Sequence, residues 1–239
     1  MTKRFYVVLC AFSVGCTSSD LKKEELKEQL TTPTLFVHVA DLSKSTTRLT
    51  VYNDTAIARS IYYMLASQGS GTIKVVYITA NSLSEEVVTI PVLSLDTTNV
   101  DTIHNSYLRS KALRANKAAK DNFNRQAEDN IQRYIATISK PHDQEYSDVR
   151  NALSMVSIIC RQSIFQNHRK FVGLFSDIKQ DAAGQGNNKL QPVQFDDATV
   201  LCVRPALSPE QLNILFSQNV EVLTSSQDIL PFIQFHQLH

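Results

Sequence analysis

The chain has 239 residues, 43% of them hydrophobic, which is enough to bury one substantial core in a single domain. Its 24 basic and 23 acidic residues leave a net charge of +1, so no global field favours a nucleic acid or an acidic substrate as partner. No apolar run reaches the roughly eighteen residues that span a bilayer, which excludes a multi-pass membrane protein.

The beginning of the chain has the order of a bacterial export signal. Lys3 and Arg4 supply a positive start, residues 5–12 form a short apolar run, and Ser13-Val14-Gly15 leads into Cys16. This ending resembles a bacterial lipobox, in which a cysteine after a small residue is lipidated and becomes the mature N-terminus. The resemblance implies a lipoprotein-type signal over residues 1–16, lipidation of Cys16, and a lipid-anchored protein of the bacterial cell envelope, periplasmic or surface-exposed. An ordinary signal peptide and a buried N-terminal strand are the alternatives.

Residues 17–33 are polar and are expected to form a tether, with the folded domain over residues 34–239. Residues 35–40 are a nearly unbroken apolar run that ends at Asp41, which is typical of a strand buried on both faces of a parallel sheet. Helical spacing predicts a helix from about Asp54 to Ser67. Two runs rich in β-branched residues, 73–80 and 87–93, predict an antiparallel hairpin at a sheet edge.

A long helical stretch is predicted between His104 and Lys140, as one bent helix or as two, because apolar residues recur there at threes and fours. Its first half is basic. We expect these basic side chains to form a solvated helix face, because the aromatic residues that interleave with basic ones in nucleic-acid-binding surfaces are absent. They are Arg109, Lys111, Arg114, Lys117, Lys120 and Arg125.

The rest of the chain continues the alternation of strands and helices. An apolar helix over 149–165 precedes a second buried strand, 171–177, which again ends in an aspartate, and a Gly/Asn/Gln-rich loop follows over 182–191. Strands are predicted over 199–203 and 220–223, with a helix between them that a capping box opens at Ser208, and the tail from Asp228 is expected to cap the core. The pattern predicts an α/β fold, a doubly wound and mostly parallel sheet with one antiparallel edge hairpin.

Oxygen-bearing side chains follow both buried strands. Asp41 and Asp177 close these strands and are therefore expected to face the same crevice at the carboxyl edge of the sheet. Ser43 and Ser45 alternate with Asp41, so one carboxylate and two hydroxyls can converge on a point. Such hard oxygen ligands suit Mg²⁺ or Mn²⁺. The alternative is that Asp41 and Ser43 cap the next segment and Asp177 makes an Asx turn.

These motifs resemble the metal-ion-dependent adhesion site (MIDAS) of the von Willebrand factor A (VWA) family, which begins with Asp-x-Ser-x-Ser after the first strand. Asp41, Ser43 and Ser45 match that element, and Ser147 stands at the family's threonine position, in a stretch that ends Ala-Leu. Asp177 fits the aspartate that closes the next strand, with Ile178 in place of the usual glycine. The resemblance covers about residues 34–223 and implies a VWA-like fold.

The resemblance also implies a divalent metal, Mg²⁺ or Mn²⁺, held by Asp41, Ser43, Ser45, Ser147 and Asp177. Such a metal keeps an open coordination position that a partner protein fills with a carboxylate. The expected function is thus that of a lipid-anchored, metal-dependent protein-binding domain, not an enzyme, with no nucleic-acid partner and with the membrane reached through the anchor.

Other chemistry is represented only weakly. The sequence has no G-x-S-x-G, H-E-x-x-H or Walker motif, and His38, inside the first strand, is expected to be a hydrogen-bonded core residue. The strongest enzyme alternative is Mg²⁺-dependent phosphoryl transfer at Asp41 and Asp177, with Asp181 as a further ligand. A metal-free structural lipoprotein scaffold is the third. Cys160 and Cys202 lie in apolar runs and are expected to be buried small hydrophobic residues.

Overall fold

The computed structural model describes residues 32–46, 55–95, 97–141, 143–179, 191–218 and 220–237. The signal segment, Cys16, most of the tether, the loop 182–190 and Asp181 lie outside the described residues. In the described part no helix is long and apolar enough to cross a membrane.

The sheet has six strands in the order β3-β2-β1-β4-β5-β6. The strand order reverses between β1 (Thr34–Asp41) and its neighbour β4. All neighbours are parallel except β2 (Gly71–Ile78) and β3 (Val88–Val92), which form the antiparallel edge pair. The remaining strands are β4 (Arg169–Phe175), β5 (Thr199–Val203) and β6 (Val220–Leu223). The predicted fold class, a mostly parallel α/β sheet with one antiparallel edge, is confirmed.

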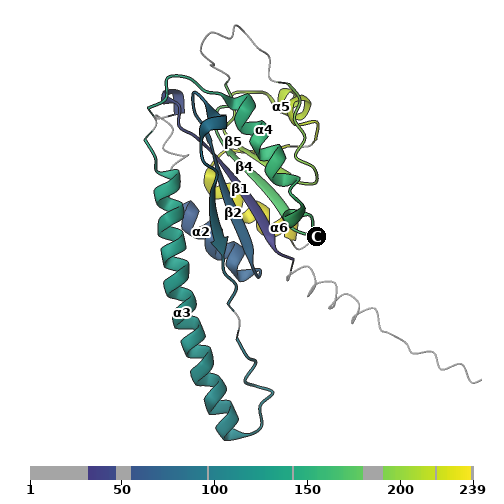
Figure 1. Ribbon diagram of the computed structural model, residues 1–239. Helices are drawn as coiled ribbons and strands as arrows, with labels where there is room; N and C mark the ends of the chain where they lie inside the picture. Colours follow the sequence, from purple (N-terminus) through teal and green to yellow (C-terminus); the bar gives the residue numbers. More distant parts are fainter. Residues whose placement is uncertain are drawn as a thin grey trace, which may run out of the picture.

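Helices cover both faces of the sheet (Figure 1). One face is packed by α2 (Thr55–Ser67), the second half of α3 (Ser106–Ile138) and α6 (Ile229–Gln237). The other is packed by α4 (Val149–Cys160) and α5 (Pro209–Phe216). Short 3-10 turns are η1 (Lys44–Thr46), η3 (Ser82–Ser84), η4 (Ser163–Phe165) and η5 (Ser226–Asp228).

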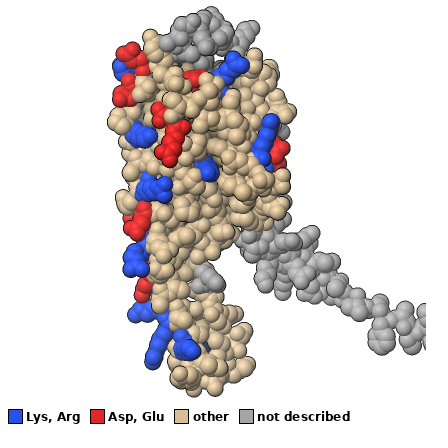
Figure 2. Space-filling view, in the orientation of Figure 1, with Lys and Arg blue, Asp and Glu red and all other residues tan. Residues whose placement is uncertain are grey.

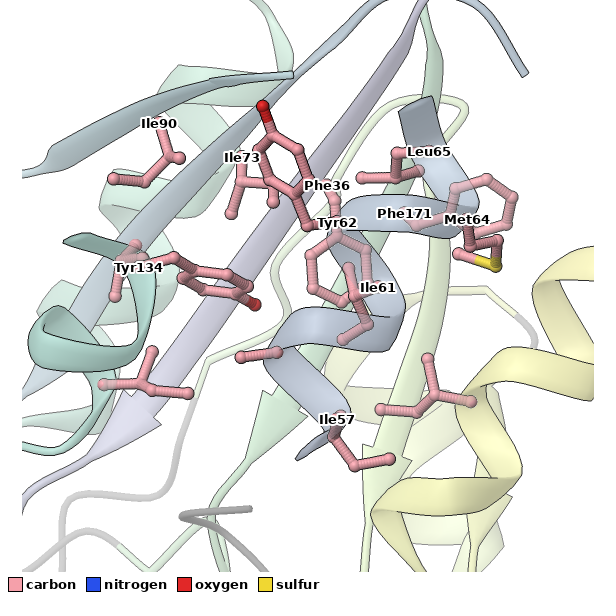
Figure 3. Packing of buried hydrophobic residues seen from close by; sticks show 14 of the residues in the cluster. Phe36, Ile57, Ile61, Tyr62, Met64, Leu65, Ile73, Ile90, Tyr134 and Phe171 are labelled. Atoms are coloured by element: carbon pink, nitrogen blue, oxygen red, sulfur yellow. The ribbon is translucent and has the colours of Figure 1, made fainter. Parts of the chain in front are cut away.

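The alternation of side chains along β1 divides the core into two layers. Leu35, Val37 and Val39 point to the α4 and α5 side, whereas Phe36 and Ala40 belong to the α2, α3 and α6 side. Figure 3 shows this second layer, in which the rings of Phe36, Tyr62 and Tyr134 meet the aliphatic side chains of α2. Helices cover both faces of the sheet, so β1 is buried along its whole length.

Two helices can be compared with the sequence predictions. The stretch 104–140, predicted as one bent helix or as two, contains one continuous helix of 33 residues, α3, because no proline or glycine interrupts it. A bidentate ion pair of Arg59 with Glu128, at 2.6 and 2.7 Å, joins α2 to its second half. The helix predicted over 149–165 ends at Cys160, and η4 contains its last residues. The capping box at Ser208 is present, and Ile229 and Ile233 bring the tail into the core as predicted.

Candidate functional site

The two aspartates of the candidate site lie at the carboxyl edge of neighbouring strands. β1 ends at Asp41, while β4 ends at Phe175, so Asp177 stands two residues beyond its strand. Ala40 pairs with Phe175 in the sheet, which places Asp41 beside Ser176. Asp41 and Ser176 are almost fully buried and Asp177 is 9% exposed. Parallel pairing of β1 with β4 thus brings both carboxylates to one edge.

Both oxygens of the Asp41 carboxylate accept hydrogen bonds. The Ser43 backbone N–H donates to Oδ1 at 2.9 Å, and the Ser176 hydroxyl donates to Oδ2 at 2.6 Å. Burial raises the pKa of Asp41 above its usual value, and the negative charge of Asp177 raises it further, although the hydrogen bonds from Ser176 and Ser43 oppose both effects. Asp41 is therefore a carboxylate whose charge is incompletely balanced by the described protein groups.

The hydroxyls of Ser43 and Ser45 meet above the end of β1. Their Oγ atoms are 2.9 Å apart, with Ser43 buried and Ser45 exposed to solvent. The loop is held by the Thr46 hydroxyl, which lies 3.1 Å from the Asp41 carbonyl oxygen and 2.8 Å from that of Ser43. The sequence Asp-x-Ser-x-Ser thus folds into a tight turn that presents one hydroxyl to the interior and one to water.

The loop that carries Ser147 is fastened to the loop after β1. Gln144 donates its N–H to the Leu42 carbonyl at 3.2 Å and accepts the Lys44 N–H at 2.9 Å. Further along, the Asp148 N–H donates to the Thr79 carbonyl at 2.7 Å. Ser147 is buried between these two anchor points. Within the described residues its hydroxyl forms no hydrogen bond with Asp41, Ser43 or Ser45.

Asp177 is turned by the backbone that follows it. The Lys179 N–H donates to Asp177 Oδ1 at 3.2 Å, and the Lys179 ammonium lies 3.6 Å from Oδ2. Together with the Ser43 N–H bond to Asp41, this is the Asx-type geometry that the structural alternative requires. Both interpretations of the aspartates therefore share the same local geometry. They differ in whether a cation completes it.

The role of Ser176 at this edge was not identified from the sequence, and the backbone of Ile178 is unusual. Ser176 donates to Asp41 and accepts the Ile178 N–H at 2.9 Å, so it connects the two aspartate loops. Ile178 has φ of 59°, the left-handed region that favours glycine, although it is buried and β-branched. The substitution of Ile for the usual glycine was visible in the sequence, but the role of Ser176 depends on the register of β1 with β4.

The donor set suits a hard divalent cation. An octahedral Mg²⁺ with oxygen ligands at about 2.0–2.1 Å separates adjacent ligand oxygens by about 2.9 Å. The Ser43 and Ser45 hydroxyls, which hydrogen-bond each other at 2.9 Å, have a separation compatible with that geometry, and Asp41 lies at the base of the same turn. The described residues contain no cluster of three or more His, Cys, Asp or Glu side chains suited to a metal. A metal here would therefore be held mainly by hydroxyls, with only two carboxylates nearby.

No family model matches the chain, and no curated protein matches it. Among solved structures, proximal thread matrix protein 1 from the mussel byssus is 12% identical with a TM-score of 0.44, over 87% of this chain and 46% of that one. A von Willebrand factor type A protein from Catenulispora acidiphila is 10% identical with a TM-score of 0.41, over 87% and 42%. The pilus adhesin SpaC from Lactobacillus rhamnosus GG is 10% identical with a TM-score of 0.40, over 86% and 30%.

The chain spans less than half the length of each of these solved chains. Their identities and TM-scores are too low to transfer a function. The fold class therefore rests on the strand order and the helix layers of this chain.

Proposed function

We propose that this chain is a VWA-like protein-binding domain that holds Mg²⁺ or Mn²⁺ at the end of β1, on a lipid-anchored protein of the bacterial cell envelope. Asp41, Ser43 and Ser45 would hold the ion, with Ser147 and Asp177 as neighbouring oxygen donors. The observation that carries the proposal is the approach of the two serine hydroxyls to 2.9 Å above the buried carboxylate. The Ser45 hydroxyl, which hydrogen-bonds that of Ser43, is exposed and could reach an ion from the solvent side.

The ligand class follows from the small negative charge of the donor set. A bound divalent ion with few carboxylate ligands keeps most of its positive charge and attracts an external anion. Ser45 is exposed, so the ion would be open to solvent on that side. An exposed ion pair, Lys44 with Glu145 at 3.2 Å, lies beside this opening. A carboxylate side chain on a partner protein has both the charge and the reach to bind there.

The donor set is less suited to phosphoryl transfer. That reaction needs groups that position the nucleophile and neutralise the phosphate, in addition to the metal. His38 does not supply one, because its ring is fully buried against Phe175 and Tyr134 in the core. Hydrolysis of a generic phosphate ester that is lost in Asp177→Asn would favour the enzyme alternative. Absence of both metal binding and turnover would favour the scaffold alternative.

Calorimetric titration of the metal-depleted protein with Mg²⁺ and Mn²⁺ tests the proposal. We expect saturable binding to the wild type and a loss of at least about tenfold in affinity in Ser45→Ala, because substitutions that only orient metal ligands already cost about 10–100-fold. Ser84→Ala is the matched control, since Ser84 is also exposed but bonds only the Asn81 carbonyl, at 2.8 Å. Equal heats from wild type and Ser45→Ala would refute a site at this turn.

The anchor is tested separately. Cys16 lies outside the described residues, and its lipidation is proposed from the signal sequence alone. Metabolic labelling with palmitate is expected to mark the wild type and not Cys16→Ser, and the variant is expected to be released from the membrane fraction. A labelled Cys16→Ser protein would contradict the anchor.

A further inference from the structure

The first part of α3 extends beyond the sheet. The buried residues of this helix all lie between Ala127 and Ile138. Phe123 and Gln126 line a hollow together with Ser70, whose carbonyl accepts the Thr34 N–H at the amino edge of the sheet. Residues before this level therefore run past that edge, as Figure 1 shows. We name residues 106–126, none of which is buried, the helical arm. It is about 30 Å long at 1.5 Å per residue.

Four basic residues are spaced by three along the arm, so that they wind around about half of its circumference: Lys111, Arg114, Lys117 and Lys120. We name them the basic stripe. All four are exposed, and within the described residues none pairs with a carboxylate. Arg109, one turn earlier, is 3.7 Å from Asp101. Figure 2 shows blue side chains along the outer side of the arm, with red ones between them toward the sheet.

The basic stripe does not favour the helix that carries it. Residues three apart are neighbours on a helix surface, so these like charges repel one another. The first turn of α3, where the helix dipole favours negative charge, contains Arg109 and no acidic residue. No acidic residue interrupts the series from Lys111 to Lys120, and Asp121 follows directly after it. The arrangement is better explained by an anionic partner.

The arm also exposes apolar side chains beside the basic stripe. Tyr107 is 74% exposed, and Leu108 and Leu113 are each 51% exposed. Helices that lie on membranes place Lys and Arg near the lipid phosphates and apolar side chains in the headgroup region, and the arm offers both kinds of side chain. Nucleic acid is less suited, because the stripe has no interleaved aromatic residues on which bases could stack.

The position of the arm agrees with a membrane partner. The arm lies beyond the amino edge of the sheet, where β1 begins at Thr34 and where the preceding residues join the domain. The candidate metal site lies at the opposite, carboxyl edge. A surface bound by the arm would therefore leave the Asp41 turn facing away from it, open to a partner protein.

We propose that the basic stripe of the helical arm binds an anionic phospholipid surface. This binding depends neither on a metal at Asp41 nor on lipidation of Cys16. Each basic residue close to an anionic membrane contributes about fivefold in affinity. Loss of two of them should weaken binding by about 25-fold.

Co-sedimentation of the full chain with vesicles tests this inference, in a Cys16→Ser background so that no attached lipid contributes. Vesicles of phosphatidylcholine alone are compared with vesicles that also contain phosphatidylglycerol. The test variant is Arg114→Gln with Lys117→Gln. The matched control, Arg133→Gln with Arg161→Gln, removes two exposed charges outside the arm.

We expect binding only to the anionic vesicles, reduced about 25-fold in the test variant and less than twofold in the control. It should weaken from about 0.1 M to about 1 M salt, as the Debye length falls from about 10 Å to about 3 Å. The test variant should be at least as heat-stable as wild type, because repulsion is removed, so lost binding would not reflect unfolding. Equal binding of test and control variants would overturn the inference. Tighter binding to polyglutamate than to the anionic vesicles would also overturn it and assign the stripe to an acidic protein.

Discussion

His38 lies in the middle of β1 and makes the stability of the domain depend on pH. Its ring stacks on Phe175 at 4.1 Å between centroids, and its Nδ1 lies 2.7 Å from the Tyr134 hydroxyl. Its Nε2 has no hydrogen-bond partner within the described residues. Burial lowers the pKa of His38 to about 3. The folded state therefore keeps this imidazole neutral at pH values where the unfolded chain protonates it.

The direction and size of the effect follow from linkage. Below about pH 6.5, the pKa of a histidine in the unfolded chain, the unfolded state binds a proton at this imidazole and the folded state does not. The free energy of unfolding therefore falls as the pH falls, until the folded state is protonated as well at about pH 3. From pH 7.5 to pH 5.0 the loss is about 2 kcal/mol. For a domain of this size that is about 4–8 °C in melting temperature.

Urea unfolding of wild type and His38→Asn at pH 7.5 and pH 5.0 isolates this contribution, since Asn retains a hydrogen-bonding group near Tyr134. The stability of wild type relative to the variant should fall by about 2 kcal/mol at the lower pH. His104→Asn, at an exposed histidine, is the matched control. If the difference in free energy of unfolding between wild type and His38→Asn changed by less than about 0.5 kcal/mol between the two pH values, the assignment of a neutral, buried His38 would be refuted.

Three further substitutions probe the sheet and its carboxyl edge. Because the pKa of Asp41 is raised, its charged form destabilises the fold at neutral pH, so Asp41→Asn should raise the melting temperature without metal. Mg²⁺ at ten times its Kd should add about 1.4 kcal/mol to the free energy of unfolding of the wild type and nothing to that of Asp41→Asn, which makes the wild type the more stable of the two. Ser176→Ala removes the 2.6 Å hydrogen bond to Asp41 and should cost about 1–3 kcal/mol in urea unfolding at pH 7.5, and less once Asp41 is protonated. Gly173→Ala should lower the free energy of unfolding by about 1–3 kcal/mol, and with it the urea midpoint, because its Cβ would lie 2.9 Å from Phe36 Cζ and 3.0 Å from Phe175 Cε2. An unchanged midpoint would show that the two rings can move.

The strands could be predicted because their signals are local. The run 35–40 is apolar on both alternating faces, and the structure buries both. The arm could not be predicted in the same way. Leu108, Ala112, Ala115 and Ala119 have helical spacing, but small alanine side chains satisfy a helix in water as well as one in a core. Periodicity identified the helix and not the point at which it leaves the sheet, which depends on the length of the neighbouring strands.

In the candidate site, too, the features with a local sequence signal could be predicted and the long-range contacts could not. That Asp41 and Asp177 share an edge follows from two parallel strands that each lead into an aspartate, and the sequence contains both. The contact of Ser176 with Asp41 needs the pairing of Ala40 with Phe175, which no local pattern specifies. His38 was expected to be a hydrogen-bonded core histidine, but its partner Tyr134 is 96 residues away on α3. Contacts across such a separation depend on how α3 lies on the sheet.

The carboxyl edge of β1 and β4 combines features that folding alone does not favour. The pKa of Asp41 is raised by its burial, so its negative charge is held at a cost in stability. Of the four non-glycine residues with positive φ in the described ranges, Ile178 is the one with a β-branched side chain, next to Asp177. Asx turns alone would need neither a buried charge nor a strained isoleucine, because Asn and Gly make them more readily. Strain and a buried charge at one edge are typical of a site kept for a ligand, and a divalent cation would balance the charge of Asp41, whereas Asp177 already pairs with Lys179.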